Sequence, residues 1–217
     1  VEIPATKMKK PLLFLFLALY TLCTAQTAPD NTEFRIVGYV PGYRDISKIP
    51  DHILRELDIA CYAFATIDST GIPHVPDEKQ LKRFARRAHK LGIDVMISFN
   101  GRHKYYAEMV ASPASRQRFI DEIWRMVRRY KLAGVDNDWE YPMGRDGSGE
   151  GNLLLMKEFA KKCREGRKQY YLTAAITPGK YVGNATEGLS DELFDYIDWF
   201  NVMVYDDYSE TKEGMHH

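Results

Sequence analysis

From Phe34 onward, short apolar runs alternate with longer segments whose apolar residues recur at helical spacing. Six runs rich in β-branched and aromatic residues are predicted strands: 35–40, 59–65, 94–99, 134–140, 170–177 and 199–205. Runs of this kind suit strands that are buried on both faces of a parallel sheet. Repeated strand–helix units therefore predict an α/β fold whose sheet is either closed as a barrel or open and doubly wound.

Three helices are predicted between these strands, and each carries one apolar stripe. The stripes are Leu81, Phe84, Ala85 and Ala88; Phe119, Ile120, Ile123, Trp124 and Val127; and Leu155, Met156, Phe159, Ala160 and Cys163. We interpret them as core-facing surfaces. Ser112 is the expected N-cap of the second helix, with Pro113 in the first helical position. No low-complexity linker interrupts residues 34–205, so one domain over 34–217 is the simplest division.

The first residues have a different character. Met8 is followed by two lysines, an apolar run through Leu22 and a polar stretch, which predicts a secretory signal peptide over residues 8–25. Residues 1–7 then form an upstream extension and residues 26–33 a short linker. We expect a secreted or periplasmic protein that meets the membrane only through this cleaved peptide. A buried N-terminal helix and lipid anchoring through Cys23 are the alternatives.

Charge and cysteine content narrow the choice of partners. Lys plus Arg and Asp plus Glu each total 30, so the composition offers no signal for nucleic acid or an anionic membrane. Beyond the signal peptide only Cys61 and Cys163 remain, one in a predicted strand and one in a predicted helix. Two buried thiols are expected in place of a disulfide. No metal-binding spacing such as CxxC occurs, and no cofactor is predicted.

Three acids at alternate positions carry the chemical signal. Asp136, Asp138 and Glu140 point the same way if residues 134–140 form a strand. Their mutual repulsion favours the retention of at least one proton, which raises an apparent pKa toward neutrality. A general acid that works near pH 7 requires such a pKa. A solvated strand face and a Mg²⁺ or Ca²⁺ site are the competing interpretations.

The segment around these acids, 134–142 (GVDNDWEYP), resembles the signature strand of the family 18 chitinases. Other segments resemble that family in order and spacing: Gly38–Tyr39, Tyr62–Phe64, Ser98–Gly101 and Met203–Asp206. The resemblance implies a (β/α)8 TIM barrel, of which about six βα units are present here. A complete barrel takes about 250 residues, so we expect truncation after the sixth strand. We also expect residues 1–217 alone to expose unpaired strand edges.

The resemblance implies specific roles. Glu140 would protonate the glycosidic oxygen, and Asp138 would orient the substrate's acetamido group, whose oxygen acts as the nucleophile in a substrate-assisted retaining mechanism. Asp136 would share a proton with Asp138 and be held by Tyr39 and Ser98.

Further residues are implied as substrate contacts. Tyr205 would hydrogen-bond the acetamido group, and the other expected contacts are Met203, Asp206, Tyr39, Ser98, Phe64 and Tyr141. The implied substrate is chitin or another glycan of β-1,4-linked N-acetylglucosamine, and the full-length protein is expected to be a monomer. An N-glycan core, peptidoglycan and a non-catalytic chitin-binding lectin remain alternatives, although such lectins typically lose the acid at position 140.

Three residues depart from the family pattern. Ala133 stands where the family usually has an aspartate. Asn137 occupies a position that is normally apolar and helix-facing, so it needs a hydrogen-bond partner there. Asn100 replaces the first glycine of the family's SxGG turn, and we expect it to reshape that turn.

Overall fold

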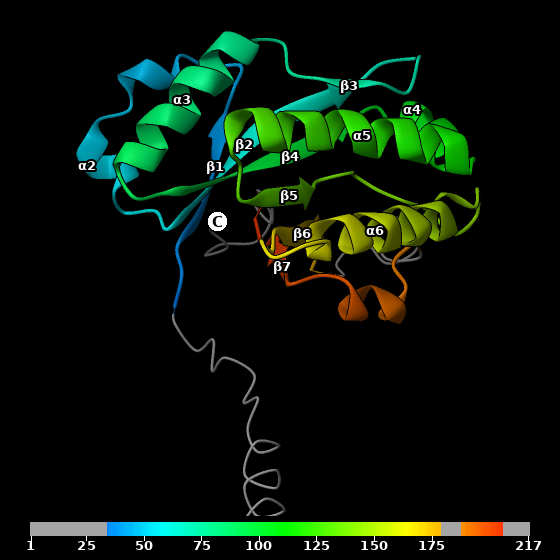
Figure 1. Ribbon diagram of the computed structural model, residues 1–217. Coiled ribbons are helices and arrows are strands. Elements are labelled where there is room, and N and C mark those ends of the chain that lie inside the picture. The colour runs from blue at the N-terminus through cyan, green and yellow to red at the C-terminus, as the bar shows by residue number, and fades with distance from the viewer. Residues whose placement is uncertain (1–33, 179–187, 206–217) are drawn as a thin grey trace, which may run out of the picture. The chain divides into compact units, whose positions relative to one another are not determined.

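The computed structural model describes residues 34–178 and 188–205, and its centre is a sheet of six parallel strands with one short antiparallel addition. The strands are β1 (Val37–Pro41), β2 (Ile59–Ile67), β3 (Pro73–His74), β4 (Asp94–Gly101), β5 (Gly134–Asn137), β6 (Tyr171–Ile176) and β7 (Trp199–Val202). The spatial order is β1-β2-β4-β5-β6-β7, and β3 pairs antiparallel with β2. Sequential parallel pairing around a curved sheet matches an incomplete (β/α)8 barrel and confirms the predicted fold class (Figure 1).

Helices follow the strands and pack on one side of the sheet (Figure 1). They are α2 (Asp51–Leu54), α3 (Glu78–Lys90), α4 (His103–Val110), α5 (Pro113–Tyr130) and α6 (Ser148–Arg164), with 3₁₀ turns η1 (Ile46–Lys48) and η2 (Asp191–Asp195). Every residue of the three predicted apolar stripes is buried. The predicted start of α5 is also confirmed, because the Ser112 hydroxyl accepts a hydrogen bond from Ser115 N at 3.2 Å.

The main core lies between the sheet and these helices, and aromatic rings fill its centre. Phe99 of β4 packs against three rings, with centroid distances of 5.9 Å to Tyr106, 5.1 Å to Phe119 and 5.9 Å to Phe159. A smaller cluster contains Ile59, Cys61 and Met96. Cys61 and Cys163 are both buried and unbridged, as predicted.

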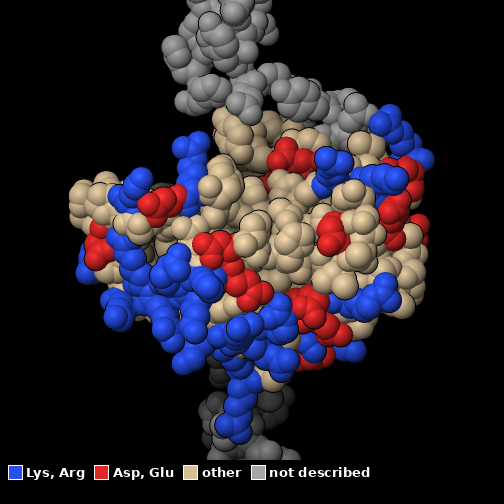
Figure 2. Space-filling view, turned by 90° about the horizontal axis from the view of Figure 1, so that it is seen from above, with Lys and Arg blue, Asp and Glu red and all other residues tan. Residues whose placement is uncertain are grey.

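The balanced total charge is not spread evenly over the surface. Within its 13 residues α3 carries the basic residues Lys79, Lys82, Arg83, Arg86, Arg87 and Lys90. Figure 2 views the side on which α3 and α5 lie and shows Lys and Arg gathered in one area. Among the described residues, no helix has the length and apolar character needed to cross a membrane.

Two strands end three residues earlier than the sequence predicts, and the predicted strand 170–177 ends one residue earlier, at Ile176. The predicted strand 134–140 stops at Asn137, and the predicted strand 199–205 stops at Val202. The first difference has a local cause: the Asn137 side-chain oxygen accepts a hydrogen bond from Trp139 N at 3.1 Å, which takes that amide out of the strand ladder. Asp138 and Glu140 therefore lie just beyond β5. The short elements β3, α2 and α4 were not predicted.

Candidate active site

The candidate site lies at the carboxyl ends of the strands, where polar side chains replace the apolar ones of the core. Strand register brings the first three of them together, because Asp136 of β5 is paired with Ser98 of β4 on one side and with Thr173 of β6 on the other. All three are fully buried. Functional groups in this fold are positioned at this end of the sheet.

Asp136 accepts hydrogen bonds from four side chains. One carboxylate oxygen accepts from Tyr39 Oη at 2.8 Å and from Ser98 Oγ at 2.7 Å. The other accepts from Thr173 Oγ1 at 2.5 Å and from Asn201 Nδ2 at 3.2 Å. Burial raises the pKa of Asp136 above its ordinary value, and the four donors offset part of that rise. A carboxyl that accepts two bonds at each oxygen is in its ionised form, which has about four acceptor positions.

Asp138 has the opposite surroundings. It is 6% exposed, and among the described residues its Oδ1 has no hydrogen-bond partner. Burial, followed by the charges of Asp136 and Glu140, raises the pKa of Asp138 from 3.8 to about 7. Because Asp136 accepts from four side-chain donors and Asp138 from one, Asn100, we place the proton of this coupled pair on Asp138.

Glu140 is the exposed end of the acid series. The side-chain amide of Asn100 lies between it and Asp138, with Nδ2 at 3.3 Å from Asp138 Oδ2 and 3.4 Å from Glu140 Oε1. Tyr141 is next to Glu140, and burial followed by a hydrogen bond to that carboxylate raises the pKa of the Tyr141 phenol. The acids thus run from a buried ionised group to a solvent-facing one. This order suits proton delivery to a bound molecule.

An open cleft of about 540 Å³ adjoins the acids on the side of β1 and β7. Of the predicted site residues, it is lined by Tyr39, Phe64, Asp138, Met203 and Tyr205. The structure therefore brings most of the expected substrate contacts to one surface.

Three predicted contacts do not line this cleft. Ser98 is fully buried and donates to Asp136. Tyr141 borders a separate small hollow beside Pro142 and Leu189, although it also neighbours Glu140. Asp206 lies outside the described residues. The prediction for Asp206 therefore stays a prediction.

Asn137, which departs from the family pattern, has the hydrogen-bond partner that a buried polar side chain requires. On the helix-facing side of β5 its Nδ2 donates to Asn152 Oδ1 of α6 at 2.9 Å and lies 3.4 Å from Met156 Sδ. Ala133, where the family usually has an acid, packs against the small cluster of Ile59, Cys61 and Met96. An apolar side chain suits that apolar environment.

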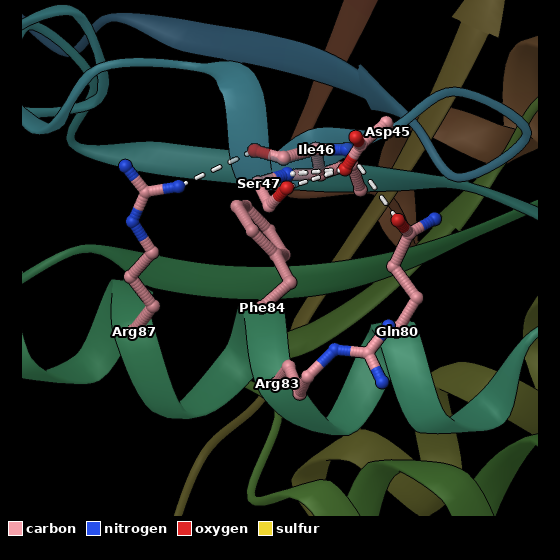
Figure 3. Close-up of a pocket in the computed structure, with 7 residues that line it drawn as sticks. All are labelled: Asp45, Ile46, Ser47, Gln80, Arg83, Phe84 and Arg87. Carbon is pink, nitrogen blue, oxygen red and sulfur yellow. Dashed lines mark hydrogen bonds between the residues drawn. The ribbon is translucent and has the colours of Figure 1, made fainter.

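A second hollow, of about 330 Å³, lies between η1 and α3 (Figure 3). Its polar groups already have partners within the protein. Arg87 donates to Asp51 Oδ1 and to the carbonyl of Ile46, and Gln80 Nε2 donates to the carbonyl of Gly42. It contains none of the three acids, so we place the active site in the cleft beside β1 and β7.

Sequence reasoning missed two of the four donors to Asp136, Thr173 and Asn201. Each is a polar residue inside an otherwise apolar predicted strand, and that contrast was the available signal. The position of Asn100 between two acids was also missed, since only its effect on the turn was considered.

Comparison with known proteins identifies the family. The family model described as glycosyl hydrolases family 18 matches residues 35–217. The chain belongs to this family. Among family 18 relatives, it is 32% identical over 107 residues to a class V chitinase of Arabidopsis thaliana, covering 48% of this chain and 28% of that protein. It is 26% identical over 222 residues to a probable endochitinase of Caenorhabditis elegans, covering 94% of this chain and 32% of that protein.

Solved family 18 structures have the same arrangement of strands and helices. A family 18 chitinase from Cycas revoluta in complex with (GlcNAc)3 superposes with a TM-score of 0.69 at 26% identity. The similarity covers 82% of this chain and 57% of that one. The chain thus spans a little over half the length of this structure and about a third or less of the two relatives above.

Proposed function

We propose that this chain supplies the catalytic acids of a chitinase-like hydrolase that cleaves β-1,4-linked N-acetylglucosamine oligomers or polymers. The observation that carries the proposal is a buried Asp138 that lines a 540 Å³ cleft and shares the side-chain amide of Asn100 with the exposed Glu140. Family membership and the oligosaccharide complex of the Cycas revoluta chitinase support the choice of substrate.

In this mechanism Glu140 donates a proton to the glycosidic oxygen. The acetamido oxygen of the substrate attacks the anomeric carbon, and no glycosyl–enzyme bond forms. The carbonyl oxygen of Asp138 accepts a hydrogen bond from the acetamido N–H and orients that group, while Tyr205 and Met203 contact the same sugar. Asp136 remains ionised throughout and keeps the proton of the pair on Asp138. Glu140 then takes a proton from the attacking water, which restores the resting state and retains the anomeric configuration.

The test uses the full-length protein with two substrates of equal length. N-acetylglucosamine tetramer should be cleaved and give the β-anomer first in early NMR spectra, since two inversions retain configuration. The matched glucosamine tetramer lacks the acetyl oxygen and should stay intact. Initial α-anomer, or equal cleavage of both tetramers, would exclude substrate assistance. Binding of the acetylated tetramer without cleavage would instead identify a lectin.

Export is a separate part of the proposal. We infer that residues 8–25 direct secretion, on the basis of the lysines and apolar run in that segment, which lies outside the described residues. N-terminal sequencing of the mature protein should begin near residue 26. Retention of the whole segment, or a lipid on Cys23, would overturn this assignment.

A further inference from the structure

Asn100 is the residue from which we draw a further inference. It lies near the end of β4, and the direction of its amide is fixed by its own neighbour, because Gly101 N donates to Asn100 Oδ1. A backbone N–H pairs with the side-chain oxygen and not with the nitrogen. The two N–H groups of Nδ2 therefore face the acids, at 3.3 Å from Asp138 Oδ2 and 3.4 Å from Glu140 Oε1.

The contact arises at a position where the sequence departs from the SxGG pattern. In the family pattern that the segment 98–101 resembles, glycine occupies this position and has no side chain to offer. The amide carries no charge and does not titrate, so it donates to both carboxyls at every working pH. One side chain thus joins the buried acid to the exposed one.

We propose that Asn100 is a positioning residue that holds Asp138 and Glu140 in one geometry and lowers the pH at which this pair releases its proton. The effect on catalysis rests on the proposed function, whereas the effect on the carboxyl titration does not. A donor to a carboxylate stabilises the ionised form, and a donor shared by two carboxylates offsets their repulsion.

The neighbouring acids raise the pKa of Asp138, and Asn100 opposes them. The titratable groups that face Asp138 or share its cleft are Asp136 of β5, Glu140 and Tyr141 after β5, Tyr39 of β1, Cys61 of β2, Tyr106 of α4, and Arg35 and Tyr205 of the cleft wall. Burial and the charges of Asp136 and Glu140 raise the pKa of Asp138, and the hydrogen bond from Asn100 lowers it. Loss of the Asn100 amide should therefore raise the pKa of Asp138.

The first measurement is a titration of the Asp138 carboxyl carbon by ¹³C NMR in the full-length protein. Asn100→Gly should raise the midpoint by about one pH unit, the change expected when one hydrogen bond to a carboxylate is lost. Asn100→Asp, which is nearly isosteric and keeps the strand end filled, should raise it further because it adds a negative charge. Thr66→Ala is the matched control, since Thr66 pairs with Asn100 in the sheet register but bonds to His74. In this variant the titration midpoint of Asp138 should not move.

The second measurement is the pH–rate profile on N-acetylglucosamine tetramer, in which both limbs should move to higher pH in the two Asn100 variants. An unchanged titration midpoint in folded Asn100→Gly and Asn100→Asp would overturn the proposal. A shifted midpoint in a protein that cleaves no chitooligosaccharide would retain the positioning role and reject the proposed function. A lower kcat with unchanged midpoint and unchanged profile would show a purely structural role and also overturn it.

Discussion

Asn137 donates a hydrogen bond to Asn152 at 2.9 Å, on the face of β5 opposite to the acids. Both residues are buried, at 4% and 2% exposure. The pair joins the strand that carries the acids to α6, the helix behind it. The same Asn137 side chain ends the strand by accepting from Trp139 N. One residue therefore both joins β5 to α6 and ends the strand.

Asn137→Ala should destabilise the protein by about 1–3 kcal/mol, because it leaves Asn152 buried without its donor and frees Trp139 N. Urea unfolding monitored by tryptophan fluorescence measures the loss. The double variant Asn137→Val with Asn152→Leu removes both polar partners and should recover part of it. An Asn137→Ala protein with an unchanged unfolding midpoint would show that the pair contributes no stability.

Glu140→Gln should reduce turnover of a chitooligosaccharide by roughly 10²–10⁴-fold, since the amide fills the same space but donates no proton to the leaving group. Sugar affinity, measured by calorimetry on the full-length protein, should stay close to wild type. Glu150→Gln, at an exposed position of α6, is the control and should keep full activity. Turnover near wild type in Glu140→Gln would reject this residue as the acid.

The raised pKa of Asp138 predicts how stability changes with pH. The folded state binds this proton between the ordinary pKa of 3.8 and the folded pKa of about 7, whereas the unfolded state releases it. Stability therefore falls as the pH rises through that range. Asp138→Asn cannot titrate, so its stability relative to wild type should improve from about pH 4.5 to about pH 8, by on the order of 2–4 kcal/mol.

Urea unfolding of both proteins at several pH values measures this difference. Asp121→Asn, on the exposed face of α5, is the matched control and should show a constant difference from wild type. An Asp138→Asn protein whose relative stability did not change with pH would show that Asp138 titrates normally in the folded state.

Activity should survive treatment with EDTA. Four protein donors already occupy the oxygens of Asp136, which leaves this carboxylate no lone pair for a cation. Within residues 34–178 and 188–205, no cluster of three or more His, Cys, Asp or Glu side chains is arranged to hold a metal ion. Loss of activity on chelation, restored by Mg²⁺ or Ca²⁺, would favour a metal-dependent reaction.

The sequence predicts those features that depend on local periodicity. Helical stripes such as Leu81 to Ala88 are all buried, and alternation along 134–140 correctly groups the acids on one side. The need of Asn137 for a partner was also predictable from its polarity. That Asn152 is the partner was not, because the choice depends on how α6 lies against β5.

The two donors that the sequence analysis did not identify, Thr173 and Asn201, contact Asp136 through long-range strand register. Thr173 reaches Asp136 because β5 and β6 pair with these two residues opposite each other. Asn201 reaches it across the curved sheet from β7, and it also donates to Tyr39 Oη of β1 at 3.0 Å. Neither relationship follows from neighbouring residues in the chain, since register and curvature are set by the whole sheet.

Asp136 also links the site to the order of folding. Its four donors come from β1, β4, β6 and β7, at sequence separations of 97, 38, 37 and 65 residues. Contacts so distant along the chain form slowly, because the entropy of closing the intervening loops opposes them. Burial of the charged Asp136 carboxylate inside the sheet is energetically unfavourable until these donors are in place. We therefore expect the hydrogen bonds to Asp136 to form in the same late folding step as the pairing of β1 and β7 with their neighbouring strands. No catalytically competent intermediate should precede that step.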